Sequence, residues 1–125
     1  MEKPLGTEMH QATFVAQGAF PLPIYEDILE GLVNTIGMQI PPGETGQPIT
    51  KVFPAEDGSG GNGVTVVQFL VESFAVIDAW DDLDHFFVII NSCRPFDCRV
   101  AGDYLQTKGH ILDFAQSRVR NPDIP

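Results

Sequence analysis

The dipeptide Glu72-Ser73 is the place in the sequence whose residue types and order could support a chemical reaction. It lies between two apolar runs, VTVVQFLV and FAVIDAW. A Glu-Ser step in this position is either a polar hairpin corner or a bond that the protein cuts in itself. By periodicity alone Ser73 is a turn residue. The second interpretation would make the chain an enzyme.

The two cysteines lie in the segment CRPFDC, at Cys93 and Cys98. A single C-x4-C pair lacks the second ligand pair of a zinc site, and the histidines (His10, His85, His110) are widely scattered. We therefore expect free thiols and no metal site. Two roles stay open for Cys93, because free cysteine is among the most buried residue types but is also a proton donor.

Two predicted helices and six predicted strands must position these residues. The segment 21–37 carries apolar residues at helical spacing and ends at Gly37, a residue typical of a helix C-terminus. The segment 97–109 repeats this pattern over a shorter length. The predicted strands are 10–18, 49–53, 64–71, 74–80, 85–92 and 110–116.

The order of these elements indicates the fold class. Strands that follow one another directly pair in antiparallel fashion, and two amphipathic helices can cover only one face of a sheet. The sequence predicts an α/β (α+β) two-layer sandwich, an antiparallel sheet with two helices on one face, with residues 1–125 as a single domain. We expect the segment 55–63 to be a flexible glycine-rich connection and the tail 120–125 to fray.

The charge balance narrows the class of partner. The chain has 17 acidic and 7 basic residues and a formal net charge of -10. Nucleic acid and anionic membranes need a basic surface, so we expect neither as a partner. The acidic surface favours a cationic ligand, or serves solubility alone. With no apolar run of membrane-spanning length and no signal peptide at the start, we expect a cytoplasmic protein.

The stretch from Val64 to Cys93 resembles the small prokaryotic S-adenosylmethionine decarboxylases. In that family a β-branched strand leads to a Glu-Ser step, then a second strand, a short His-Thr-Tyr/Trp-Pro-Glu motif, and a third strand that ends in cysteine. Glu72-Ser73, Trp80 and Cys93 match this pattern without a gap. The order of elements in the rest of the chain also fits.

The resemblance implies a decarboxylase of polyamine (spermidine) biosynthesis that makes its own pyruvoyl cofactor. The hydroxyl of Ser73 would attack the preceding carbonyl, and the resulting ester would eliminate. The chain then breaks after Glu72 and leaves the pyruvoyl group at residue 73. Its ketone would bind the amine of S-adenosylmethionine or another cationic amino acid and act as the electron sink. Cys93 would return a proton to the product as general acid.

The resemblance also implies roles for three neighbours. Thr65 stands where the family has a serine, and its hydroxyl would assist the acyl shift. Asp82 stands where the motif has a glutamate that holds the ribose hydroxyls of the substrate, and a carboxylate can accept from both. Trp80, the aromatic of the motif, would bind the substrate as well.

Further positions depart from the family pattern. Phe74 replaces a histidine, Asp81 replaces the motif proline, and Asp78 replaces the histidine that removes the proton during ester elimination. A free aspartate is a weaker base than a free histidine, although Asp78 would be the corresponding catalytic residue.

Three hypotheses therefore stay open. The chain is an active pyruvoyl-dependent decarboxylase, a non-processing homologue that acts as a binding or regulatory partner, or an unrelated α/β sandwich whose Glu-Ser step is a coincidence. Because the family pairs two protomers, we also expect a homodimer, which an edge strand near 111–114 would permit.

Overall fold

The fold is a six-stranded sheet with two helices, seen here in a computed structural model that describes residues 7–54, 61–80 and 82–122. In chain order the elements are β1 (Glu8–Gln17), α1 (Leu22–Thr35), a short 3-10 helix (Gly43–Gly46), β2 (Ile49–Pro54), β3 (Asn62–Leu70), β4 (Ser73–Trp80), β5 (His85–Ser92), α2 (Cys98–Gln106) and β6 (His110–Arg120).

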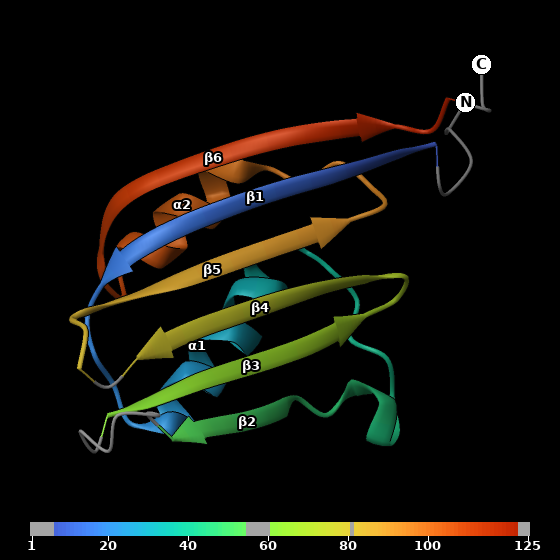
Figure 1. Cartoon of the computed structure of the whole chain (residues 1–125). Coiled ribbons are helices and arrows are strands. Elements are labelled where there is room, and N and C mark those ends of the chain that lie inside the picture. Colours follow the sequence, from blue (N-terminus) through green and yellow to red (C-terminus); the bar gives the residue numbers. More distant parts are fainter. Residues whose placement is uncertain (1–6, 55–60, 81, 123–125) are drawn as a thin grey trace.

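The strands lie in the order β2-β3-β4-β5-β1-β6, and every neighbouring pair is antiparallel. The first strand of the chain is thus inserted between β5 and the last strand. Figure 1 shows both helices on the same side of the sheet, behind it in that view. This arrangement confirms the predicted two-layer sandwich.

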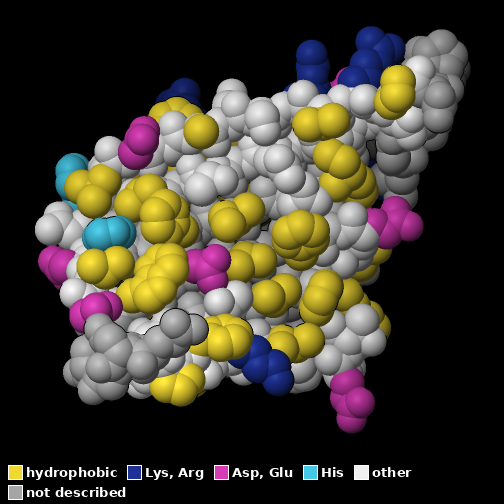
Figure 2. All heavy atoms as spheres, in the orientation of Figure 1, with side chains coloured by type: hydrophobic (Ala, Val, Ile, Leu, Met, Phe, Trp, Pro, Cys, Tyr) yellow, Lys and Arg dark blue, Asp and Glu magenta, His cyan; other side chains and the backbone are white. Residues whose placement is uncertain are grey.

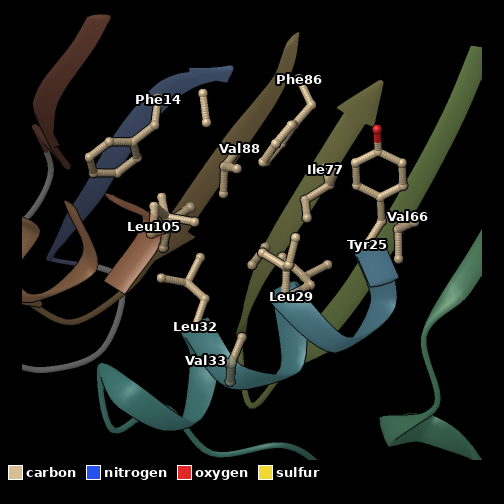
Figure 3. Close-up of a cluster of buried hydrophobic side chains, with 14 of the residues drawn as sticks. Phe14, Tyr25, Leu29, Leu32, Val33, Val66, Ile77, Phe86, Val88 and Leu105 are labelled. Carbon is tan, nitrogen blue, oxygen red and sulfur yellow. The ribbon is translucent and has the colours of Figure 1, made fainter. Parts of the chain in front are cut away.

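The core lies between the helices and the sheet. Five residues of α1 are buried, and Figure 3 shows Tyr25, Leu29 and Leu32 directed at strand residues that include Ile77 and Phe86. Burial alternates along the central strands, because successive side chains of a strand point to opposite faces. The core is therefore on one face of the sheet only.

The helix ends follow from local sequence. Gly37 lies just beyond α1 with a φ of 76°, which is the left-handed conformation predicted for this glycine. The Asp97 side chain accepts hydrogen bonds from the backbone N–H groups of Arg99 (2.9 Å) and Val100 (3.4 Å), and so caps the start of α2.

Two predicted boundaries differ from the structure. β6 continues to Arg120, four residues beyond the predicted end, because β1 begins at Glu8 and pairs with it over this length. The prediction of a frayed tail was therefore wrong for Arg120, and residues 123–125 lie outside the described part of the chain. Asn62 and Gly63, which were predicted to be part of the glycine-rich connection, belong to β3. Residues 55–60 of that connection lie outside the described part of the chain.

The second face of the sheet, which we call the open face, is covered by no helix of the described residues. Large apolar side chains on it are partly or well exposed, among them Phe69 (44%), Phe74 (37%) and Trp80 (38%). Figure 2 shows hydrophobic side chains spread over this face. Its apolar residues on the four central strands are Met9, Val15, Val67, Phe69, Phe74, Val76, Trp80, Phe87 and Ile89.

Candidate functional site

Ser73 and Cys93 are in contact, although they lie twenty residues apart in the chain. Ser73 begins β4 and Cys93 directly follows β5, the neighbouring strand. The backbone N–H of Cys93 donates to Ser73 Oγ over 3.2 Å, and the Ser73 hydroxyl donates to Cys93 Sγ over 3.7 Å. The pairing of β4 with β5 thus brings together the two residues that the sequence singled out first.

The peptide bond between Glu72 and Ser73 follows a residue in an unfavourable backbone conformation. Val71 and Glu72 form a two-residue turn, with Leu70 and Ser73 paired across its base. Glu72 has a φ of 58°, and it is the one residue other than glycine with a positive φ in the described part of the chain. A side chain in this region costs about 1–2 kcal/mol. Conformational strain is therefore stored next to the bond that self-cleavage would break.

A cavity of about 360 Å³ opens beside this turn. The segment after α1 (36–39), the turn (70–73) and the corner after β5 (92–96) enclose it. Ser73 and Cys93 lie in its wall together with Met38 and Phe96, and charged groups come from Glu72 and Arg94. Such a lining suits a small ligand that has both an apolar part and charged groups.

Sequence reasoning missed Met38, Arg94 and Phe96 as lining residues. Arg94 and Phe96 lie within three positions of Cys93, so closeness to a candidate residue was a usable signal for them. No such signal existed for Met38, because it lies in a loop more than thirty residues before Ser73 and reaches the cavity only in the folded chain.

Thr65 and Asp78 form a second pair, on the open face. They lie directly opposite each other on β3 and β4, and the Thr65 hydroxyl donates to Asp78 Oδ1 over 2.6 Å. On the neighbouring strands, Lys51 of β2 lies beside Thr65, and Phe87 of β5 lies beside Asp78. The carboxylate is half-buried among these neighbours.

The structure does not bring this second pair to Ser73 within one chain. Asp78 is five residues from Ser73 along β4, which is about 16 Å in an extended strand. The odd spacing also places the two side chains on opposite faces of the sheet. Asp78 therefore cannot reach the hydroxyl of Ser73 in its own chain.

The two predicted substrate-binding residues lie at the far end of β4. Trp80 is its last residue and packs edge-on against Phe87, with 6.0 Å between the ring centres. Asp82 lies in the following turn, close to Gly61. Neither residue lines the cavity next to Ser73, and Asp81 is outside the described residues.

Cys98 lies apart from these groups. It begins α2 and lines a different cavity, of about 350 Å³, together with His10 and Arg118. Burial raises the pKa of the Cys98 thiol, and the charge of Asp97 adds to the rise. The thiol is therefore protonated at neutral pH and is a poor nucleophile. Both cysteines are free, and the described residues contain no group of three or more side chains suited to a metal ion.

The fold is similar to that of a solved enzyme structure. The adenosylmethionine decarboxylase from Aquifex aeolicus VF5 superimposes with a TM-score of 0.62 and 15% sequence identity, over 98% of this chain and 96% of that one. No family model and no curated protein matches the sequence. The likeness confirms the predicted S-adenosylmethionine decarboxylase-like fold. Neither helix of the described residues is long and apolar enough to span a membrane.

Proposed function

We propose that this chain cuts itself between Glu72 and Ser73 and uses the resulting pyruvoyl group to decarboxylate S-adenosylmethionine or a related cationic amino acid of polyamine biosynthesis. One observation carries the proposal. The Ser73 hydroxyl is held by both the N–H and the thiol of Cys93, in the wall of a cavity and directly after the strained Glu72.

The contacts of Ser73 suit self-cleavage. A serine hydroxyl has one proton and two lone pairs, and here the proton is directed at Cys93 Sγ while one lone pair accepts from the Cys93 N–H. One lone pair remains to attack the Glu72 carbonyl carbon. Attack converts the peptide bond into an ester on Oγ and frees the amine of residue 73, and loss of the Cα proton of residue 73 then expels the Glu72 carboxylate. The dehydroalanine that remains tautomerises to an imine, which water hydrolyses to the pyruvoyl ketone with release of ammonia.

The same cavity offers groups for the substrate. Met38 and Phe96 provide apolar surface, and Glu72 provides negative charge for a cationic substrate. The pyruvoyl ketone would accept the substrate amine and take up the electrons released with carbon dioxide. The Cys93 thiol, 3.7 Å from the present Oγ, is near enough to return a proton to the product.

The group that accepts a proton during cleavage would come from a second copy of the chain. The exposed apolar residues of the open face favour association, because burial stabilises by about 25 cal/mol per Å² of apolar surface. The turn at Glu72 and Ser73 joins the ends of β3 and β4, and Glu72 is exposed. A partner packed on the open face would bring its own Thr65 and Asp78 towards this turn. The homodimer expected from the sequence is thus part of the proposal.

A specific observation also favours the second candidate, a non-processing homologue that binds a ligand without cutting itself. Asp78 already accepts a hydrogen bond from Thr65, and it replaces the histidine of the family motif. A carboxylate that is held as an acceptor is a weak base for the elimination step. Such a protein would keep the cavity next to Ser73 and would bind the substrate or an active partner chain.

The experiment that separates the two candidates is an intact mass under denaturing conditions, taken on fresh protein and after incubation. The decarboxylase proposal expects two fragments, 1–72 and 73–125, the second with a blocked pyruvoyl end. Ser73→Ala is the control and remains whole. A wild-type chain that persists as one 13.7 kDa species contradicts self-cleavage and favours the second candidate.

A further inference from the structure

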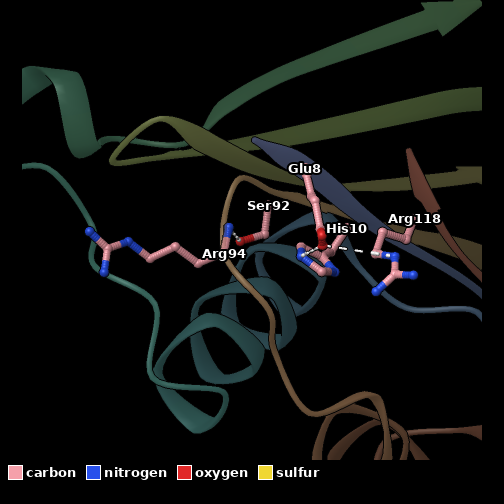
Figure 4. A network of polar contacts seen from close by, with 5 residues as sticks. All are labelled: Glu8, His10, Ser92, Arg94 and Arg118. Carbon is pink, nitrogen blue, oxygen red and sulfur yellow. Dashed lines mark hydrogen bonds and ion pairs between the residues drawn. The ribbon is translucent and has the colours of Figure 1, made fainter. Parts of the chain in front are cut away.

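Ser92 is a buried polar residue next to the candidate site. Neither the sequence nor the proposed reaction gives Ser92 a role. It is the last residue of β5, only 2% exposed, and it lines the same cavity as Ser73 and Cys93. Its side-chain oxygen accepts a hydrogen bond from the backbone N–H of Arg94 over 3.1 Å. Figure 4 shows this bond at the point where the chain leaves the sheet.

This bond closes a tight turn around Cys93. Residues 93–97 have no regular secondary structure, so the regular backbone hydrogen bonds of a strand or helix do not hold Cys93. The bond from Arg94 to Ser92 spans Cys93 and restricts the peptide groups on both sides of it. The Cys93 N–H, directed at Ser73 Oγ, belongs to one of these restricted peptide groups.

We infer that Ser92 is a positioning residue, whose hydroxyl holds the corner so that both the N–H and the thiol of Cys93 face Ser73 Oγ. The N–H would hold Oγ in place for attack and would stabilise the negative charge that develops on Oγ later, when the ester eliminates and the Cβ–Oγ bond breaks. The effect on self-cleavage rests on the proposed function. The orientation of Cys93 by Ser92 does not depend on whether the chain cuts itself.

The test compares Ser92→Ala, which lacks the acceptor, with Ser92→Thr, which keeps it. Alkylation of the cysteines by iodoacetamide, followed peptide by peptide by mass spectrometry, reports the environment of Cys93. Cys98 in the same molecule is the internal control. We expect Ser92→Ala to speed alkylation of Cys93 severalfold with little change at Cys98, and Ser92→Thr to restore the wild-type rate.

Two results would overturn the inference. An unchanged Cys93 rate in Ser92→Ala means that the hydroxyl does not hold the corner, and an equal rise at both cysteines means general loosening of the fold. Amide hydrogen exchange on the wild type gives a check without substitution, because the Arg94 and Cys93 amides should exchange slowly. Rapid exchange at Arg94 also contradicts the inference, even if Ser92→Ala fails to fold.

Self-cleavage gives the second readout. If the wild type is cut, Ser92→Ala should slow cleavage by roughly tenfold to a hundredfold, because small misplacements of reacting groups have effects of this size. Ser92→Thr should recover most of the rate. Failure of the two proposals can be told apart, since an uncut wild type contradicts the proposed function while the alkylation experiment still decides the role of Ser92.

Discussion

Asp78 accepts a hydrogen bond from Thr65 on the open face, about 16 Å along β4 from Ser73. The residues that the family pattern groups together thus form two separate pairs in one chain. Ser73 contacts Cys93 in the wall of the cavity. Thr65 on β3 contacts Asp78 on the adjacent strand β4, on the open face. This separation motivates the first three predictions.

Asp78→His should increase the rate of self-cleavage. Imidazole is a stronger base than a free carboxylate near neutral pH, and the gain should be about tenfold or more. The measurement is the fraction of cut chain against time by intact mass. Asp78→Asn is the matched control and should slow cleavage. If the Asp78→His variant folds but is cut no faster, even when combined with Phe74→His, then Asp78 is not at the position of the base.

Co-expression of two defective chains tests whether the site is shared between copies. A chain with Asp78→Ala should remain uncut alone, and so should a chain with Ser73→Ala. When both are made together, the Asp78→Ala chain should be cut in mixed dimers, because its partner supplies an intact Asp78. Differently tagged chains allow the mixed dimer to be purified and weighed. A purified mixed dimer that stays whole would contradict sharing.

Val76→Glu should dissociate the proposed dimer. Val76 lies on the open face, in the row between Val67 and Ile89, so a charge there opposes burial against a second copy. Sedimentation velocity should show a monomer for this variant and a dimer for the wild type. Val100→Glu makes the same change at an exposed position of α2 and should leave the dimer intact. Equal behaviour of both variants would exclude the open face as the interface.

Glu72→Gly should stabilise the uncut chain. Glycine adopts a φ of 58° without steric cost, so relief of the left-handed conformation should raise the free energy of unfolding by about 1 kcal/mol. Urea unfolding of the uncut Ser73→Ala background, with and without Glu72→Gly, measures the difference. Val71→Gly, at the neighbouring turn position, lacks this relief and should not stabilise. If Glu72→Gly is neutral or destabilising, little strain is stored at the turn.

The same substitution should slow self-cleavage in a chain with Ser73 intact, since part of the strain is released when the peptide bond breaks. A Glu72→Gly chain that is cut faster than the wild type would show that backbone strain does not assist the reaction.

The sequence by itself determined the elements, because helix and strand periodicity is a local property of the side chains. The stripe that ends at Gly37 and the β-branched run before Ser73 are examples, and the structure confirms both. The family resemblance singled out Ser73 and Cys93, and the structure brings them into contact because the start of β4 lies beside the end of β5. The same resemblance predicts that Asp78 acts with Ser73, but their odd spacing places the two side chains on opposite faces of β4.

Tertiary structure alone decided what lies on each face and at each edge. Both helices pack on the face of Ser73, which leaves Thr65 and Asp78 on the open face among exposed apolar residues. The insertion of β1 between β5 and β6 extended the last strand to Arg120, and the loop after α1 brought Met38 to the cavity. Residues distant in the chain make these contacts, and their energies depend on packing that no local pattern of residues encodes.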